Sequence, residues 1–257
     1  MTRKMNSRNL RKYWNVVFGL QRDEALGLLV LAWIGKRLLP NYKFTWPQLD
    51  WFYSAELAET LDHFEEASGF NAHRRFALQE LLRLTEAVPG DTAECGVYKG
   101  CGSYIILKHN IRSTCPRTHH LFDSFEGLSA PQGQDGSYWT AGALSVQEDA
   151  VRQNLAQFPN IRLYKGWIPD RFGDVAERTF SFVHVDVDLY QPTYDSIVFF
   201  YERLNPGAVF VCDDYGFRTC PGATTAIDEF LRDKPEKMVG LAGGGGFFMK
   251  GCMTSSQ

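Results

Sequence analysis

The chain has 257 residues, of which 44% are hydrophobic and 22% are charged, and these proportions exclude a largely disordered protein. Its net charge of −3 excludes general electrostatic binding of nucleic acid. The charge is uneven, because residues 1–37 carry eight Lys or Arg against Asp23 and Glu24, a local charge of +6 that leaves −9 for the rest. A basic N-terminal segment of this kind would meet an anionic partner or surface, or the acidic body itself.

Residues 1–71 are predicted to form a helical N-terminal extension or lid. A helix is expected over 21–39, ending at Pro40, and its apolar run Ala25–Ile34 is too short to span a bilayer. We expect this helix to pack on the body or in a homo-oligomer, and weak peripheral membrane contact is the alternative. Residues 41–54 are rich in aromatic side chains and predict an ordered strap, and helices are expected over 55–70 and 72–87.

The six cysteines have neither CxxC spacing nor histidine partners at zinc spacing. Several of them lie in segments predicted to be core. Reduced, packed thiols in a cytoplasmic protein are therefore the favoured interpretation.

Residues 72–257 alternate between strand and helix patterns, which predicts an α/β fold with a doubly wound, mostly parallel, Rossmann-like sheet. The expected strands are 92–96, 121–123, 161–165, 182–187 and 208–212, and the expected helices are 102–111, 145–158, 192–204 and 221–231. Ser145 and Glu148 have the spacing of a capping box. A terminal hairpin is predicted from 238–241 and 247–250.

Acidic residues follow two of these strands. Asp186 and Asp188 come after the first, and Asp213 and Asp214 after the second, with a helix between the strands. The carboxyl ends of parallel strands lie at one edge of the sheet, where ligands bind. Clustered carboxylates favour a hard cation such as Mg²⁺, Mn²⁺ or Ca²⁺. The alternative is that each aspartate only caps a solvated strand end.

A glycine loop, AECGVYKGCGSY, follows the first strand with the spacing GxxxGxG. The spacing departs from GxGxxG, and Glu94 would repel a pyrophosphate, which weakens a dinucleotide interpretation. Asp123 ends the second strand, where a carboxylate can accept hydrogen bonds from a ribose diol. The combination predicts a cationic nucleoside without phosphate, such as S-adenosylmethionine. An NAD-dependent oxidoreductase or epimerase is the alternative enzyme.

The stretches AECGVYKG, FDSFEGL, VHVDVDLYQPTYDSI, and NPGAVFVCDDYG followed by CPGATTAIDEF resemble the macrocin O-methyltransferase family over roughly residues 74–250. The resemblance implies a class I methyltransferase fold, S-adenosylmethionine, a divalent metal (Mg²⁺ or Mn²⁺), and methylation of a hydroxyl on a sugar or sugar-bearing metabolite. It implies that Asp186, Asp213 and Asp214 are the metal ligands and that Asp186 is the general base. Gln191-Pro192 and Thr224-Thr225 depart from the family pattern and leave the acceptor open.

The residues expected to bind the cofactor are Glu94, Gly96, Val97, Tyr98, Asp123, Ser124, Phe125, Gly166 and Trp167. Trp167 would stack on adenine, with a core position as its alternative, and His184 is expected to be a packed histidine. Tyr138 and Trp139 are expected to line the acceptor pocket. The non-enzymatic alternative is a membrane-associated scaffold with a methyltransferase-like body, against which the intact aspartates argue.

Overall fold

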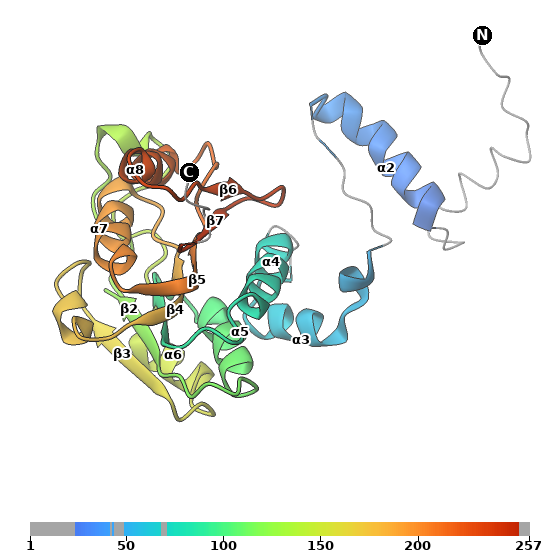
Figure 1. Ribbon diagram of the computed structural model, residues 1–257. Helices are drawn as coiled ribbons and strands as arrows, with labels where there is room; N and C mark the ends of the chain where they lie inside the picture. The colour runs from blue at the N-terminus through green and yellow to red at the C-terminus, as the bar shows by residue number, and fades with distance from the viewer. Residues whose placement is uncertain (1–23, 42, 44–48, 68–70, 252–257) are drawn as a thin grey trace, which may run out of the picture. The chain divides into compact units, whose positions relative to one another are not determined.

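The computed structural model describes residues 24–41, 43, 49–67 and 71–251 (Figure 1). The chain divides into two compact units, Met1–Ala55 and Glu56–Gln257. The proposed functional split into an extension (1–71) and a methyltransferase domain (72–257) stays a prediction.

The first unit contains helix α2 (Glu24–Leu38) and the 3-10 helix η1 (Asp50–Tyr53). The predicted helix over 21–39 is therefore present, although residues 21–23 lie outside the described part, as does much of the predicted strap. Large apolar side chains of α2 are exposed, among them Leu29, Trp33 and Leu38. Within the described residues, no helix has the length and apolarity needed to cross a bilayer. The expected packing of α2 stays a prediction.

The second unit is built on a seven-stranded sheet in the order β3-β2-β1-β4-β5-β7-β6. Only β7 runs antiparallel to its neighbours, pairing with β5 and with β6, so the predicted mostly parallel sheet and terminal hairpin are confirmed. The strands are β1 (Asp91–Cys95), β2 (His119–Asp123), β3 (Ile161–Lys165), β4 (Phe180–Val185), β5 (Leu204–Cys212), β6 (Val239–Gly240) and β7 (Gly246–Met249).

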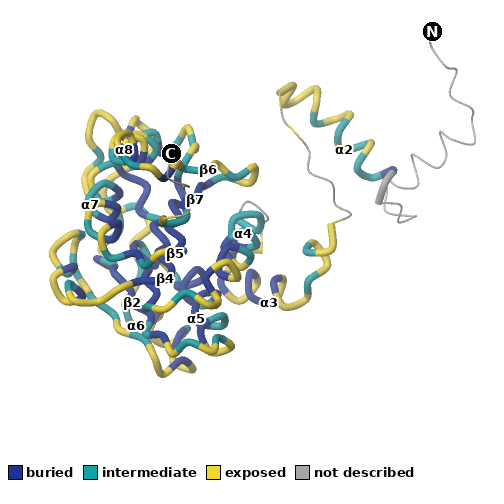
Figure 2. The backbone as a smooth tube through the Cα atoms, viewed as in Figure 1, coloured by how far each residue is buried: buried dark blue, intermediate teal, exposed yellow. Residues whose placement is uncertain are grey.

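Helices cover both faces of this sheet, and β1, β4 and most of β5 are therefore buried (Figure 2). On one face Phe182 of β4 packs with side chains of α4 and α5, and on the other Val183 packs with those of α7 and α8. The helices are α3 (Ala55–His63), α4 (Ala72–Arg83), α5 (Cys101–Asn110), α6 (Glu148–Asn154), α7 (Tyr190–Tyr201) and α8 (Pro221–Leu231), with short 3-10 helices η2 (Gly133–Asp135) and η3 (Phe172–Val175).

Several expected boundaries are wrong. The helix predicted over 145–158 spans Glu148–Asn154, and the strands predicted over 182–187 and 208–212 span Phe180–Val185 and Leu204–Cys212. The helix predicted over 55–70 ends at His63, because Glu65 adopts a left-handed backbone (φ 59°) and the Glu66 N–H donates to the Leu61 carbonyl at 2.7 Å. The helix predicted over 72–87 ends at Arg83. The helix predicted over 192–204 spans Tyr190–Tyr201, and Asn205-Pro206-Gly207 lies inside β5.

The predicted capping box at Ser145 is also wrong. Helix α6 begins only at Glu148, and its N-cap residue, Gln147, makes no side-chain cap hydrogen bond. The Glu148 carboxylate instead pairs with Arg152 and Lys165. Glu148 therefore forms ion pairs with basic side chains and takes no part in a cap.

Candidate active site

A cavity of about 570 Å³ lies where β1, β2, β4 and β5 end. Of the nine residues expected to bind the cofactor, eight line it: Glu94, Gly96, Val97, Tyr98, Asp123, Ser124, Gly166 and Trp167. The exception is Phe125, whose side chain is buried in a core cluster with Val97 and Leu121. Trp167 is 39% exposed, so it is not a core residue.

Asp123 fixes the backbone around the glycine loop. Its Oδ2 accepts hydrogen bonds from the N–H groups of Val97 (2.7 Å) and Tyr98 (3.1 Å), and its Oδ1 accepts one from Phe125 N–H (2.7 Å). A carboxylate has about four acceptor sites, so a site on Oδ1 is still open to a ribose hydroxyl. The carboxylate thus holds the loop and faces the cavity at once.

Gly96 permits a close contact between two strand ends. A Cβ at this position would lie 1.9 Å from the backbone oxygen of Asp186, and Gly96 has a left-handed φ of 80°. Gly96 was expected to bind the cofactor, and besides lining the cavity it lets β1 approach the residue that follows β4. The same contact sets the position of Asp186.

Glu94 is buried and engaged by protein partners. Its Oε2 accepts a hydrogen bond from the Ser103 hydroxyl, and its Oε1 lies 2.8 Å from Nδ1 of His184. Space for the carboxylate exists because residue 102 is glycine, where a Cβ would lie 2.0 Å from Glu94 Oε1. The charge that was expected to suit a cationic ligand is therefore shared with His184.

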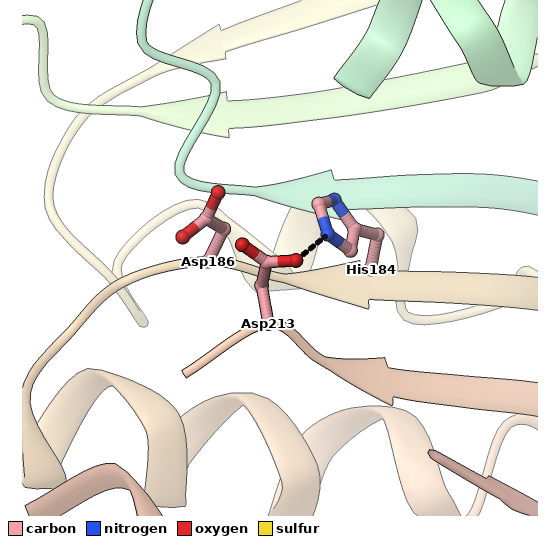
Figure 3. A group of neighbouring side chains, drawn as sticks. All are labelled: His184, Asp186 and Asp213. Atoms are coloured by element: carbon pink, nitrogen blue, oxygen red, sulfur yellow. Dashed lines mark ion pairs between the residues drawn. The ribbon is translucent and has the colours of Figure 1, made fainter. Parts of the chain in front are cut away.

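His184 is packed, as expected, but it also joins two carboxylates. Its Nε2 lies 3.5 Å from Asp213 Oδ1 (Figure 3), whereas Glu94 is bound by the other ring nitrogen, Nδ1. Burial alone would lower the pKa of His184, but the carboxylates of Asp213 and Glu94, the second hydrogen-bonded to Nδ1, raise it to about 10. His184 is consequently an imidazolium at neutral pH.

Asp213 is further paired with a residue far away in sequence. Arg74 on α4 donates from Nη1 to Asp213 Oδ2, and the two residues are 139 positions apart. Burial would raise the pKa of Asp213, but His184 beside it and the charges of Arg74 and Arg75 lower it. Asp213 is therefore ionised.

Asp186 points towards Asp213 from the end of β4 (Figure 3). Its nearest cation is Arg75, whose Nη1 lies 3.7 Å from Asp186 Oδ2. Arg75 is itself held by Glu66 through Nε at 2.8 Å and Nη2 at 3.1 Å. Burial and the charge of Asp213 raise the pKa of Asp186 to about 7, which suits a group that accepts a proton near neutral pH.

Asp214 lies in a neighbouring group with Asp188 and Cys220. Its Oδ2 accepts hydrogen bonds from the N–H groups of Val187 (3.1 Å) and Asp188 (2.7 Å). Burial and the nearby charge of Asp188 raise the pKa of Asp214 well above its ordinary value. Burial also raises the pKa of Asp188, to about 6.

The three aspartates expected to hold a metal do not converge fully. Donor atoms of His184, Asp186 and Asp213 lie within 4.8 Å of one another, and those of Asp188, Asp214 and Cys220 form a second such set. The first set includes two carboxylates, whose oxygens are the donors that Mg²⁺ and Mn²⁺ prefer. Burial, and then the charge of Asp213, raises the pKa values of Asp186 and Asp188, and a divalent cation would favour their charged forms. The donor chemistry therefore fits such a cation at Asp186 and Asp213, with Asp214 adjacent.

The rest of the cavity carries the expected acceptor-side residues, Tyr138 and Trp139. Trp139 Nε1 donates to the Cys220 sulfur at 3.3 Å. The five described cysteines are free thiols, and four are buried. Sequence reasoning missed Arg74 and Arg75, because only the packing of α4 brings them to the site.

A family model described as macrocin O-methyltransferase (TylF) matches residues 67–239. Demethyldecarbamoylnovobiocin O-methyltransferase of Streptomyces niveus is 28% identical over 185 residues, covering 62% of this chain and 68% of that protein. A second relative, the 8-demethyl-8-(2,3-dimethoxy-α-L-rhamnosyl)-tetracenomycin-C 4'-O-methyltransferase of Streptomyces olivaceus, is 29% identical over 153 residues, covering 54% of this chain and 58% of that protein.

Among solved structures, CalS11, a calicheamicin methyltransferase, superposes with a TM-score of 0.63 at 16% identity, over 96% of this chain and 95% of that one. At that identity the likeness shows the fold alone, and it is the predicted class I methyltransferase fold. The family match supports methyl transfer over the oxidoreductase and scaffold alternatives.

Proposed function

Because the chain belongs to the macrocin O-methyltransferase family, and is thus an O-methyltransferase, we propose that it transfers the methyl group of S-adenosylmethionine to a hydroxyl of a sugar or glycosylated metabolite. The main support for this proposal is that Asp123 and Asp186 line the same cavity. Residues proposed to bind the cofactor therefore share this cavity with the proposed base, Asp186.

On the cofactor side, Asp123 would accept hydrogen bonds from the ribose diol, and the exposed ring of Trp167 would stack on adenine. Excess negative charge around the cavity favours a sulfonium ion over a dinucleotide. Glu94 and Gly96 would act mainly by shaping the cavity wall, since the Glu94 carboxylate is engaged by Ser103 and His184.

On the acceptor side, Asp186 would take the proton of the hydroxyl as its oxygen forms a bond to the methyl carbon. The carbon–sulfur bond breaks at the same time, and the sulfur leaves as a neutral thioether. Arg75 and the backbone contact at Gly96 hold Asp186 in place. Tyr138 and Trp139 would cover the acceptor and exclude water.

Asp186, Asp213 and Asp214 are the proposed holders of Mg²⁺ or Mn²⁺. Such a cation would supply Lewis-acid polarisation of the acceptor's hydroxyls. One relative is named as a methyltransferase of a rhamnosyl-tetracenomycin, and this name supports a sugar hydroxyl as the acceptor.

The test is methyl transfer from labelled S-adenosylmethionine to a panel of glycosides and nucleotide-linked sugars. We expect transfer to a sugar hydroxyl, its loss in EDTA, and its return with Mg²⁺ or Mn²⁺. Full transfer by protein verified to be metal-free would end the metal part of the proposal. Transfer to nitrogen or carbon acceptors with none to hydroxyls would end the acceptor part.

A further inference from the structure

We propose that Arg74 is an intramolecular counter-cation of Asp213 that a divalent metal must displace, so that Arg74 sets the affinity of the metal site. The inference rests on the proposed function, since it takes Asp186 and Asp213 as metal ligands. It concerns what α4 contributes to that site.

The two candidate ligands differ in their counter-charges. Both oxygens of Asp213 already face cationic groups: Oδ2 accepts from Arg74, and Oδ1 lies 3.5 Å from His184 Nε2. Asp186 has a more distant partner, Arg75, at 3.7 Å. A metal that binds both aspartates would therefore meet one carboxylate with a cation only at 3.7 Å and one that is already hydrogen-bonded to a guanidinium.

Arg74 also stands between Asp213 and the cavity. Arg74 and Asp186 are among the residues that line the cavity, whereas Asp213 is not among the described residues that do so. The Asp213 side chain is 5% exposed, against 16% for Arg74 and 24% for Asp186. A cation that enters through the cavity reaches Asp186 directly but reaches Asp213 Oδ2 only after the guanidinium moves.

The guanidinium has other groups to hold it after such a move. Nη2 of Arg74 donates to Asn71 Oδ1 at 2.6 Å. The guanidinium carbon, Cζ, lies 5.2 Å from the centre of the Phe217 ring. The Arg74 Nε has no hydrogen-bond partner in the described part of the chain. Arg74 is thus tied to Asp213 through a single nitrogen, and Asn71 and Phe217 remain as partners when that contact breaks.

The energetic consequence is a competition between one cation and another. Each binding event breaks a charge-assisted hydrogen bond, and by linkage anything that removes this bond tightens the metal. If Arg74 only positioned Asp213, its loss would weaken metal binding, because the Asp213 carboxylate would be misplaced.

The experiment is calorimetric and EPR titration of Mn²⁺ into the full chain, with three variants. Arg74→Met removes the charge and keeps much of the side-chain packing, whereas Arg74→Lys keeps the charge. Arg83→Met is the matched control, because Arg83 ends the same helix in an exposed pair with Glu80. Circular dichroism verifies that each variant is folded.

We expect Arg74→Met to bind Mn²⁺ about tenfold more tightly or better, the factor carried by one hydrogen bond to a charged group. Arg74→Lys and Arg83→Met should stay close to the wild-type affinity. Equal or weaker Mn²⁺ binding by Arg74→Met, with binding retained by the wild type, would overturn the inference and leave the proposed function standing. If no form bound Mn²⁺, both the inference and the metal part of the function would fail.

Discussion

Glu94 and His184 are register partners on the adjacent parallel strands β1 and β4, and their side chains form a buried ion pair, with 2.8 Å between Oε1 and Nδ1. The other ring nitrogen of His184 faces Asp213, so the pair connects the cofactor side of the cavity with the acidic cluster.

Because of this pairing, the free energy of unfolding should fall as the pH becomes alkaline. The pKa of His184 is raised from 6.5 to about 10, so its contribution to stability is fully present below pH 6.5 and is lost as pH rises towards 10. We expect the free energy of unfolding of the wild type to fall across that window, and His184→Gln to remove this part of the fall. The variant should lose roughly 3–5 kcal/mol near neutral pH, because it leaves the buried Glu94 carboxylate without its cation and leaves Asp213 with the arginines alone.

Urea unfolding at several pH values measures both effects, with the exposed His63→Gln as the control. Parallel pH profiles for the wild type and His184→Gln would contradict the assignment of an imidazolium.

Gly102 provides the space for the Glu94 carboxylate. A methyl group there would lie 2.0 Å from Glu94 Oε1, so Gly102→Ala should displace Glu94 and destabilise the protein by about 1–3 kcal/mol. Gly173→Ala is the matched control, since a Cβ at 173 meets nothing within 4 Å. Chemical denaturation of the two variants decides this, and equal stabilities would refute the contact.

The adjacent aspartates should respond in opposite ways to neutralisation. Asp213 is stabilised as a carboxylate by His184 and Arg74, so Asp213→Asn should lower stability in the metal-free protein. Asp214 sits among like charges, and Asp214→Asn keeps an oxygen for the N–H groups of Val187 and Asp188, so it should be neutral or stabilising. From the sequence alone, a cluster of carboxylates predicts that Asp213→Asn relieves repulsion and is tolerated.

Thermal unfolding of both variants in EDTA distinguishes the two expectations. A stabilised Asp213→Asn would show that the Arg74 contact contributes nothing to the metal-free fold.

Much of the fold was predictable because it depends on local patterns. The strand at 161–165 and the helix at 221–231 match the observed bounds, since turn residues and periodicity delimit them. The aspartates at the ends of β4 and β5 were likewise found from the rule that parallel strands end at one edge.

The counter-charges were not predictable, because Arg74 reaches Asp213 across 139 positions through the packing of α4 on the sheet. The early end of α3 depends on a left-handed backbone at Glu65, a conformation that side chains rarely adopt and that no residue type there signals.

Asp123 is expected to govern cofactor affinity. Asp123→Ala should weaken S-adenosylmethionine binding by about 1.5–3 kcal/mol, the range for a hydrogen bond to a charged group. Because the same carboxylate holds three backbone N–H groups, the variant should also lose thermal stability. The exposed Asp149→Ala is the control, and unchanged affinity by fluorescence titration would remove Asp123 from the cofactor site.

The most direct test of the account is calorimetric titration of the metal-free wild-type chain with S-adenosylmethionine, in parallel with NAD. The cavity beside Asp123 predicts saturable one-to-one binding of S-adenosylmethionine that persists in EDTA, and no binding of NAD. Saturable binding of NAD together with no binding of S-adenosylmethionine would contradict it.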